Sequence, residues 1–505
     1  MLPKRMAIRH GSCYLRSVHE EGNGVVVQLG GDGGANDPRC RFYLEASKEH
    51  DHDAGLMHVV CCHNNKYWVP QQLRGHDGWI IGTADEPEED LSKQSCTLFN
   101  LHILPAATQH EERSIRFLHC MLGNCVAVSP SSDTPSRGPY LHVEHEEADV
   151  VDAFTFLDLS QHKQLPKYLA FKGDNGKYLG VQSIVDGITA AYYGGQGAFT
   201  REYLQFASED MVGDPRVVHT SFTNNDGTVR IKSNHADKFW RLGTSWIWAD
   251  SDDRNHEDTL FQVIADDDSD EAGANFIILR SQGNNKICKR LPTDGATFFS
   301  KKDCLSASDD SITQSSRLQV KEPVLSRLIY DFEYHLHEAR VYTKEVSEVY
   351  TGTYDNETDS IHTAKFTFNH QHTMTKTWSN SISIKVAGKT TFKAPVPCIV
   401  DGKIELSAEA SYSHAWGGTE TETRTRMTDY TAPVPAHTKL TVRAVASKGA
   451  CDVPYSYKQK DVLFGGEVVI HEFQDGIFSG VSTDDLKVEV RGEKLECRDV
   501  VADAS

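Results

Sequence analysis

The segment Arg74-Gly75-His76-Asp77-Gly78-Trp79 combines an indole ring with charged and polar side chains within six residues. Sugar-binding sites need this combination, because an aromatic face covers the apolar side of a pyranose while polar groups bond its hydroxyls. The segment is therefore a candidate contact for a carbohydrate. An alternative in which Trp79 closes a hydrophobic core is equally open from the sequence.

Two other tryptophans, Trp68 and Trp240, lie within strand-like phrases that recur along the chain. A large aromatic side chain at a repeated strand position more often belongs to a core than to a binding surface. We therefore predict that both indoles are buried.

Motifs for catalysis and metal binding are missing from the sequence. It contains no G-x-S-x-G, H-E-x-x-H or P-loop pattern, and the repeats offer no evident pair of carboxylates, so we expect no enzymatic activity and no cofactor. The acidic run Asp266–Glu271 lacks the alternating ligands and the glycine of a calcium loop. The 24 histidines are scattered along the chain, and we predict no metal site.

Cysteine usage and charge limit the compartment and the partners. Twelve cysteines are irregularly spaced without a CxxC pair, which predicts free thiols in a reducing compartment. The first residues lack an apolar segment of signal-peptide length, so we expect a cytoplasmic or nucleocytoplasmic protein that meets a membrane only on activation. The net charge of −20 disfavours nucleic acid and suits a neutral ligand such as a sugar.

A phrase made of a strand, a small polar turn and a second strand recurs in the first two thirds of the chain. Its six copies are MAIRHGSCYLR, MHVVCCHNNKYWV, IRFLHCMLGNCVAV, YLAFKGDNGKYLGV, TVRIKSNHADKFWRL and FIILRSQGNNKICKRL. Their spacing of about 50–60 residues indicates a repeat protein. The turns contain Asn and Gly, which tolerate positive φ, so each copy predicts a β-hairpin. Three hairpins close one small barrel, and six predict two tandem β-trefoils.

The domain boundaries follow from breaks in this repeat. We predict a first β-trefoil over residues 1–150, a short helical linker over 151–165 that ends before Pro166, and a second β-trefoil over 166–322. The remaining residues, 323–505, form a third domain that begins after Glu322. A chain of 505 residues has room for three or four such domains.

A hairpin with period-two alternation extends from about Thr377 to Gly417. Successive strand side chains point to opposite faces, so each arm has one apolar and one polar face. Both arms exceed the roughly 9–11 residues that a tilted strand needs to cross a bilayer. The residues predicted to face lipid are Ile382, Ile384, Val386, Val396, Ile399, Val400, Ile404, Leu406 and Tyr412.

The register of this hairpin is a separate hypothesis. A turn near Ile399 would place Lys393 opposite Glu405 and Lys389 opposite Glu409, so that opposite charges pair across the polar face. A half-buried hairpin of a soluble sheet has the same alternation and is the alternative interpretation. The chain has no run of about 18 apolar residues, so we expect no membrane-spanning helix.

Several phrases of the first 320 residues, among them FKGDNGKYLGV, IKSNHADKFWRL, GDPRVVHTSF and WIIGTADEPEED, resemble amaranthin-type agglutinins. The resemblance implies tandem β-trefoils joined by a short helix, binding of the disaccharide Gal-β1,3-GalNAc, and head-to-tail homodimers. It also implies that the loop ending at Trp79 forms part of the sugar site, with Trp79 and Asp77 as the strongest candidates for sugar contact and His76 as a weaker one. This sequence departs from the family there, because Gly78 stands where amaranthin has a tyrosine.

The phrases TWSNSISIKVAGK, PVPCIVDGKIELSAEASYSHAWGGT and DYTAPVPAHTKLTVRAVASKG resemble the aerolysin family of pore-forming proteins. This resemblance implies an elongated β-domain with a Ser/Thr-rich hairpin that lies folded against the soluble monomer. Together the two resemblances imply an all-β plant lectin that docks on Gal/GalNAc-containing glycans, forms a homo-oligomer and inserts the hairpin as a transmembrane pore in defence. The alternative is a non-lytic, stress-responsive lectin whose aerolysin-like part is an oligomerisation scaffold.

Overall fold

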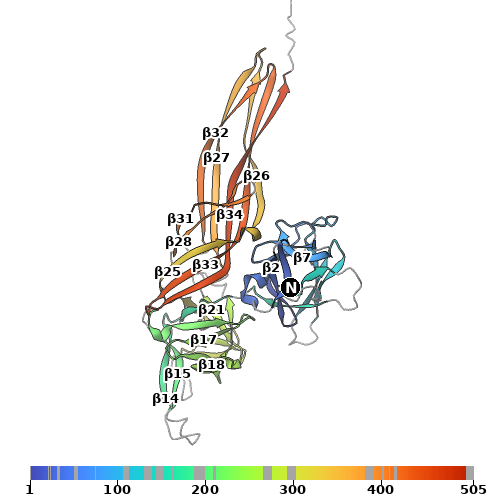
Figure 1. Ribbon diagram of the computed structural model, residues 1–505. Coiled ribbons are helices and arrows are strands. Elements are labelled where there is room, and N and C mark those ends of the chain that lie inside the picture. Colours follow the sequence, from blue (N-terminus) through green and yellow to red (C-terminus); the bar gives the residue numbers. More distant parts are fainter. Residues whose placement is uncertain are drawn as a thin grey trace, which may run out of the picture.

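A computed structural model shows that the described part of the chain is all-β, as predicted, with only short 3-10 helices beside its strands (Figure 1). The structure describes every residue except 1, 21, 23, 31–33, 50–54, 74–75, 106–112, 130–138, 144–151, 161–162, 187–198, 209–211, 266–275, 293–302, 381–389, 401–402, 409, 415–417 and 496–505. Its strands form two 12-stranded sheets, one 8-stranded sheet and one 2-stranded sheet. We call these parts the N-terminal domain (residues 5–158), the middle domain (168–321) and the C-terminal domain (324–494).

The N-terminal domain is a closed sheet around a core that contains Trp68 and Phe42. Its strands are β1 (Arg5–His10), β2 (Cys13–Glu20), β3 (Gly24–Gly30), β4 (Arg41–Ala46), β5 (Leu56–Cys61), β6 (Tyr67–Leu73), β7 (His76–Ala84), β8 (Leu98–Leu104), β9 (Ser114–His119), β10 (Asn124–Val128), β11 (Leu141–Val143) and β12 (Phe154–Asp158), with the 3-10 helices η1 (Gly34–Asn36) and η2 (Pro38–Cys40). The first and last strands meet, because β1 pairs antiparallel with β12.

That pairing corrects the prediction of a helical linker over 151–165. Residues 154–158 form β12, whose Phe154 is fully buried in the N-terminal core. The N-terminal domain therefore extends to Asp158 rather than ending at 150. The alternation of apolar and polar residues is interrupted just before this strand, which favours a helix in the sequence. A strand forms there because it pairs with β1, which lies at the opposite end of the domain in sequence.

The middle domain has the same number of strands and its own core around Trp240. The strands are β13 (Tyr168–Lys172), β14 (Tyr178–Asp186), β15 (Phe199–Ser208), β16 (His219–Thr223), β17 (Val229–Ser233), β18 (Lys238–Gly243), β19 (Trp246–Ser251), β20 (Phe261–Ala265), β21 (Phe276–Ser281), β22 (Ile287–Arg290), β23 (Leu305–Asp309) and β24 (Leu318–Lys321), with η4 (Pro215–Val217), η5 (Glu257–Thr259) and η6 (Gln314–Ser316). Trp68 and Trp240 are both fully buried, which confirms their predicted core positions.

The predicted repeat has a physical signature in its turns. The side-chain oxygens of Asn64, Asn175 and Asn284 each accept a hydrogen bond from the amide two residues later, at 3.1 Å in all three copies. Each of these asparagines also donates its side-chain amide to a backbone carbonyl of a more distant strand. The same side chain thus closes the turn and ties it to the sheet, which is why asparagine recurs there.

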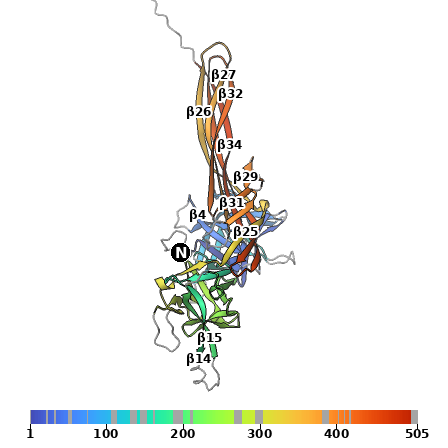
Figure 2. The ribbon, with the colours of Figure 1, turned by 90° about the vertical axis from the view of Figure 1, so that its left-hand side faces the viewer.

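The C-terminal domain is elongated and stands on the middle domain, with the N-terminal domain beside its base (Figures 1 and 2). Its elements are β25 (Val324–Tyr334), η7 (Leu336–Glu338), β26 (Arg340–Asn356), β27 (His362–Ser379), β28 (Thr390–Ala394), β29 (Pro397–Val400), β30 (Lys403–Leu406), β31 (Ala410–His414), β32 (Thr419–Val434), β33 (Thr438–Leu463) and β34 (Val468–Lys494). The 26 residues of β33 span about 85 Å at the usual rise of a strand.

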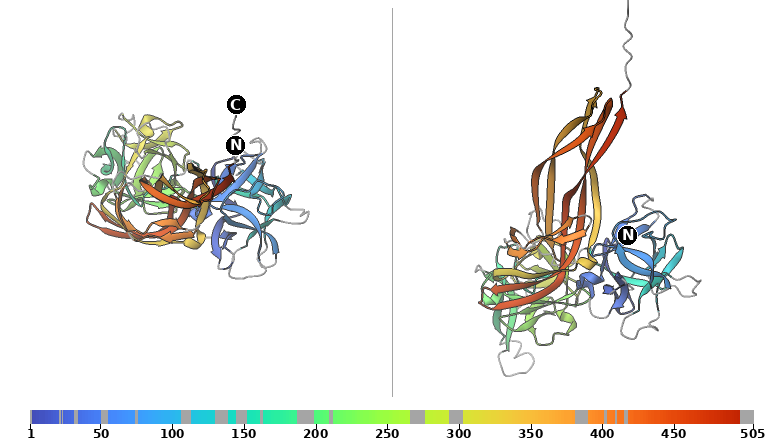
Figure 3. Two further views of the ribbon diagram at one scale, coloured as in Figure 1. Left: turned by 90° about the horizontal axis from the view of Figure 1, so that it is seen from above. Right: turned by 45° about the horizontal axis from the view of Figure 1, so that its top comes forward.

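The three domains lie against one another (Figure 3), and hydrogen bonds join them. The backbone amide of Ala35 and the side chain of Asn36 bond carbonyl oxygens of the middle-domain turn at 224–225, at 2.7 Å each. Between Lys321 and Val324 the chain passes from the sheet of the middle domain to the sheet of the C-terminal domain. Beside this junction Arg327 forms bidentate pairs with Glu322 and Asp461, at 2.7–2.9 Å.

Candidate functional site

The predicted carbohydrate residues lie on β7 of the N-terminal domain. Trp79 is partly exposed, whereas its neighbour Ile80 packs in the core around Trp68. His76 and Asp77 belong to the same strand, but their side chains lie outside the described part of the structure. Alternation along β7 therefore directs the indole of Trp79 away from the side of the strand that Ile80 buries.

Around Trp79 the fold assembles a patch of aromatic and polar side chains. The Trp79 ring meets Tyr140 edge-on with ring centroids 5.1 Å apart, and His142 stands directly opposite it on β11 at 6.2 Å. The Tyr140 hydroxyl donates to the Glu20 carboxylate at 2.5 Å. We call Trp79, Tyr140, His142 and Glu20 the Trp79 patch. Only Trp79 of this group is predicted from the sequence, because His142 opposite it on β11 lies more than sixty residues further along the chain.

Gly78, the position that departs from the amaranthin pattern, has a structural reason for its identity. It adopts φ +86°, and a Cβ atom there would lie 3.0 Å from the backbone oxygen of Val143. A side chain at this position would strain the backbone and collide with a strand of the same sheet. This chain therefore builds the neighbourhood of Trp79 without a bulky residue at 78.

The described part of the predicted membrane hairpin is folded against the C-terminal domain. Phe392 and Tyr412 pack on Trp378 with ring centroids 5.2 and 4.6 Å away, and all three side chains are buried. Val396 and Ile399 join the same core, Ile404 is partly buried and Leu406 is 44% exposed. Lys393, on the opposite face of β28, is exposed. The predicted alternation of faces is thus present in these residues.

The predicted register of the hairpin is wrong. Lys393 pairs with Ser411 rather than Glu405, and Glu405 pairs with Cys398. Ile399 pairs with Ile404, so the chain reverses beyond Val400 instead of at Ile399. The two arms are interrupted after Ala394, where Pro395 and Pro397 flank Val396, and the hairpin becomes two short ladders rather than one. Ile382, Ile384, Val386 and Lys389 lie outside the described residues, as does the side chain of Val400.

Two contacts fix the base and the end of the hairpin. The buried Tyr334 hydroxyl donates to the carbonyl oxygen of Pro395 at 2.8 Å and accepts from the indole nitrogen of Trp378 at 2.9 Å. Burial raises the pKa of Tyr334, so the hydroxyl keeps its proton. Further along, Ile399 occupies the space above Gly449 of β33, where a Cβ atom would come within 2.8 Å of its side chain.

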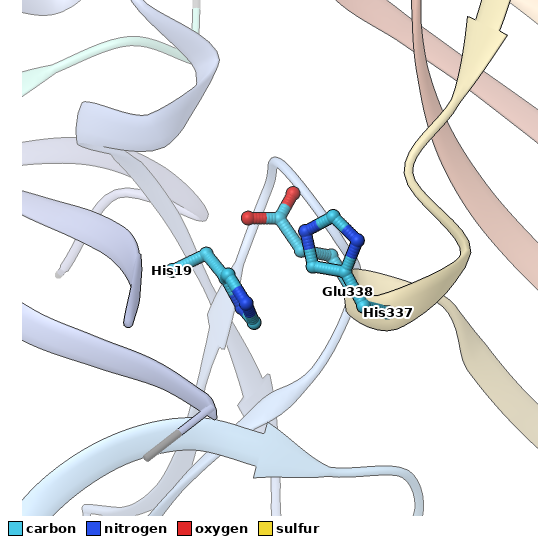
Figure 4. Close-up of side chains that lie close together, drawn as sticks. All are labelled: His19, His337 and Glu338. Atoms are coloured by element: carbon cyan, nitrogen blue, oxygen red, sulfur yellow. The ribbon is translucent and has the colours of Figure 1, made fainter. Parts of the chain in front are cut away.

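A group of histidines meets Glu338 where the N-terminal domain contacts the C-terminal domain (Figure 4). His63 Nε2 lies 2.7 Å from a Glu338 oxygen, and His335 Nδ1 lies 3.7 Å from the same oxygen. His19 and His337 approach from the exposed side, with ring centroids 4.1 Å apart. The expectation that the histidines are scattered is wrong for these four, because folding joins positions that are far apart in the chain.

Burial lowers the pKa of one member of this cluster, and contacts within the cluster lower the pKa of another. Burial lowers the pKa of His63, although the hydrogen bond to Glu338 opposes the shift. Burial alone would raise the pKa of Glu338, but the adjacent imidazoles of His335 and His63 lower it well below its usual range. The carboxylate is therefore ionised at neutral pH, and neutral imidazole is favoured at His63.

Within the described residues, no helix is long and apolar enough to cross a bilayer. None of the eleven cysteines in the described part of the chain forms a disulfide.

Comparisons with known families agree with both resemblances. The profile of the Agglutinin domain matches residues 1–135 and 163–320, and the profile described as Aerolysin toxin matches residues 325–468. No curated protein matches the chain significantly.

Similar solved structures include the lamprey immune protein, with 14% identity and a TM-score of 0.30 over 66% of this chain and 97% of that one. Another is the aerolysin-like protein of Bombina maxima, with 14% identity and a TM-score of 0.24 over 33% of this chain and 99% of that one. A third is the parasporin-2 toxin of Bacillus thuringiensis, with 20% identity and a TM-score of 0.22 over 33% and 74% of the two chains.

Proposed function

Because the chain belongs to the Agglutinin domain family and continues into an aerolysin-toxin domain, we propose that it is a glycan-binding protein that inserts a β-hairpin into membranes. The observation that carries this proposal is the docked hairpin: the apolar faces of β28 and β31 are buried within the monomer by an aromatic core. A hairpin of this kind exchanges one apolar environment for another when it leaves the protein for lipid.

We assign the N-terminal and middle domains to the β-trefoil fold. Each has twelve strands in a closed sheet, and the repeated asparagine turns support a common hairpin unit. The glycan site in this proposal is the Trp79 patch with Asp77 and His76, and its ligand is a Gal-β1,3-GalNAc-type glycan. Dimerisation through the lectin domains brings copies together, and docking of several copies on one surface raises the affinity of each.

Pore formation follows from the geometry of strands in lipid. Unpaired backbone groups are costly in a bilayer, so released hairpins from several subunits must close a barrel. The long strands of the C-terminal domain exceed the roughly 30 Å of a bilayer core and leave room for an extramembrane stem. We further propose a plant defence role, no catalytic activity, and a cytoplasmic or nucleocytoplasmic protein that becomes membrane-associated on activation.

A second function, a non-lytic lectin with an oligomerisation scaffold, is favoured by how firmly the hairpin is held. Burial of the Phe392, Val396, Ile399 and Tyr412 side chains contributes about 6–12 kcal/mol at 1.5–3 kcal/mol each. This is comparable with the stability of a whole domain. Release therefore needs a trigger, and a protein without one would keep the hairpin docked.

A reversible disulfide tether separates the two functions. A Cβ atom at position 449 would lie 3.6 Å from the Cβ atom of Ile399, within the range of disulfides. Ile399→Cys with Gly449→Cys, in a Cys398→Ser/Cys451→Ser background, should therefore lock the hairpin when oxidised. We expect oxidised protein to bind liposomes that carry Gal-β1,3-GalNAc glycolipid without releasing dye, and reduction to restore release. Equal leakage in both redox states would contradict insertion of this hairpin, and the single Ile399→Cys variant controls for the oxidant.

A further inference from the structure

Two domains supply the side chains around Glu338. His63 follows β5 in the N-terminal domain, while His335 and Glu338 lie at the short helix η7 between β25 and β26. His63 and Glu338 are each 2% exposed and His335 is 17% exposed. The ligand atoms of these three residues all lie within 4.8 Å of one another. We call His63, His335 and Glu338 the inner triad.

We propose that the inner triad binds one divalent transition-metal ion of the zinc class and thereby ties the N-terminal domain to the C-terminal domain. Imidazole nitrogen and carboxylate oxygen are ligands that zinc prefers, and three protein ligands plus a water complete a tetrahedral site. Bonds of about 2.0–2.1 Å place tetrahedral ligand atoms roughly 3.4 Å apart. The two separations from the Glu338 oxygen, 2.7 Å to His63 and 3.7 Å to His335, bracket this value, so these two ligand pairs need only small side-chain adjustments to hold the ion.

The hydrogen bonding of the triad leaves a role for a cation. One Glu338 oxygen faces two imidazole nitrogens, and only His63 is near enough to bond it, at 2.7 Å. His335 Nδ1 lies 3.7 Å from the same oxygen, beyond hydrogen-bond range. A buried carboxylate is stabilised by a cation. An ion between the three atoms would satisfy both imidazoles and the carboxylate together.

The outer pair, His19 and His337, forms a second group with Glu338, but both of its histidines are exposed. The two groups share one carboxylate and therefore compete for an ion. A site with buried ligands retains a structural metal better than one open to water, which favours the inner triad. The outer pair provides a matched control, since it has the same residue types beside the same carboxylate.

A bound ion would act on the interface as well as on its ligands. His63 is separated from Glu338 by 275 positions, so the ion would crosslink distant parts of the chain. The same interface contains a hydrogen bond from the Arg340 guanidinium to the backbone oxygen of Asp85 at 2.5 Å. Because the metal binds only the docked arrangement, it stabilises that arrangement and slows its opening.

The test uses the full-length protein, dialysed against EDTA and titrated with Zn²⁺ alone. We expect one zinc per chain by elemental analysis and calorimetry, with Co²⁺ in its place giving the intense visible absorption of a tetrahedral site. Glu338→Gln and the double variant His63→Asn/His335→Asn should weaken binding at least about tenfold. The outer double variant His19→Asn/His337→Asn should retain wild-type affinity.

Hydrogen exchange supplies a second readout that does not depend on glycan binding or leakage. Zinc should slow exchange at residues 61–65 and 335–340 in the wild type and the outer variant, and leave it unchanged in the inner variant. If the inner double variant fails to fold, His335→Asn alone replaces it, since that side chain is partly exposed and makes no hydrogen bond to Glu338. Equal zinc binding by wild type and inner variants, or loss of binding only in the outer variant, would overturn the proposal.

Discussion

Replacing Gly449 with valine should loosen the docked hairpin while leaving the long sheet intact. Gly449 lies in β33, paired with Thr343 on one side and Ser482 on the other, and Ile399 covers it. Valine is a favourable strand residue, so the backbone of β33 tolerates it. Its side chain would occupy the space that Ile399 now fills.

The magnitude follows from the contact distances. A Cβ atom at 449 lies 2.8 Å from Ile399 Cδ1, 3.5 Å from Cγ2 and 3.6 Å from Cβ. The Cδ1 atom can move, but the two valine methyls would also press on the stem of the isoleucine. Overpacking of this kind costs about 1–3 kcal/mol, which corresponds to roughly a 5- to 150-fold increase in hairpin opening.

Hydrogen exchange over residues 397–406, measured beside glycolipid liposome leakage, checks this expectation. Exchange and leakage should both accelerate in Gly449→Val. Ile399→Ala in the same chain should reverse part of the effect, because it removes the atoms that collide, and the double-mutant cycle should show coupling. The reasoning that Ile399 packs on Gly449 would be refuted if the effects of the two substitutions were additive. Unchanged hydrogen exchange in Gly449→Val would refute it as well.

Three further expectations concern other parts of the molecule. Trp79→Ala should abolish binding on a glycan array with little change in melting temperature. As a control, Trp240→Ala should lower the free energy of unfolding by about 3–5 kcal/mol, because it truncates a core side chain. A large fall in the melting temperature of Trp79→Ala would place Trp79 in a core. Burial raises the pKa of Glu89, but hydrogen bonds from Lys48, Ser47, Glu49 and His58 outweigh it and lower the pKa from 4.5 to about 2. Ionised Glu89 thus stabilises the fold above about pH 4.5 and this contribution disappears as the pH falls to about 2, so Glu89→Gln should flatten acid unfolding curves in that window. Tyr334→Phe leaves the buried Trp378 N–H without its acceptor, which should cost about 1–3 kcal/mol and speed hydrogen exchange over 390–397; unaltered exchange there would argue against a hydrogen-bonded base.

Local patterns in the sequence predict the strands and which of their faces are apolar. Alternation placed Phe392 and Tyr412 on one face and Lys393 on the other, as the structure has them. The recurring Asn-containing turns identified the hairpins of the N-terminal and middle domains. These features are predictable because they depend on residues two to four positions apart.

Features that depend on contacts between residues far apart in the chain are not predictable from the sequence. The predicted register of the hairpin is wrong because alternation determines which face a side chain lies on but not where the turn lies. In addition, the prolines on either side of Val396 divide the first arm into two strands. The local sequence of β12 does not predict a strand, because the strand that stabilises it, β1, begins near residue 5 and is distant in sequence. The histidine cluster joins His63 to Glu338 across 275 positions, a separation at which no spacing rule applies.

The net free energy of moving the hairpin from the protein core into lipid depends mainly on its polar contacts. Acyl chains are about as apolar as a leucine side chain, so the face that contains Phe392 and Ile399 loses little when a protein core is exchanged for lipid. The backbone has no such equivalent partner, because strands in lipid must satisfy every N–H and C=O internally. Within the described monomer, β28 pairs with β25 at Ile329 and Phe392, and Tyr334 holds Pro395. In the proposed insertion, those bonds would be replaced by bonds from a neighbouring subunit before the strands enter the bilayer. Clustering by the lectin domains would therefore supply the exchange partners that a single docked hairpin lacks.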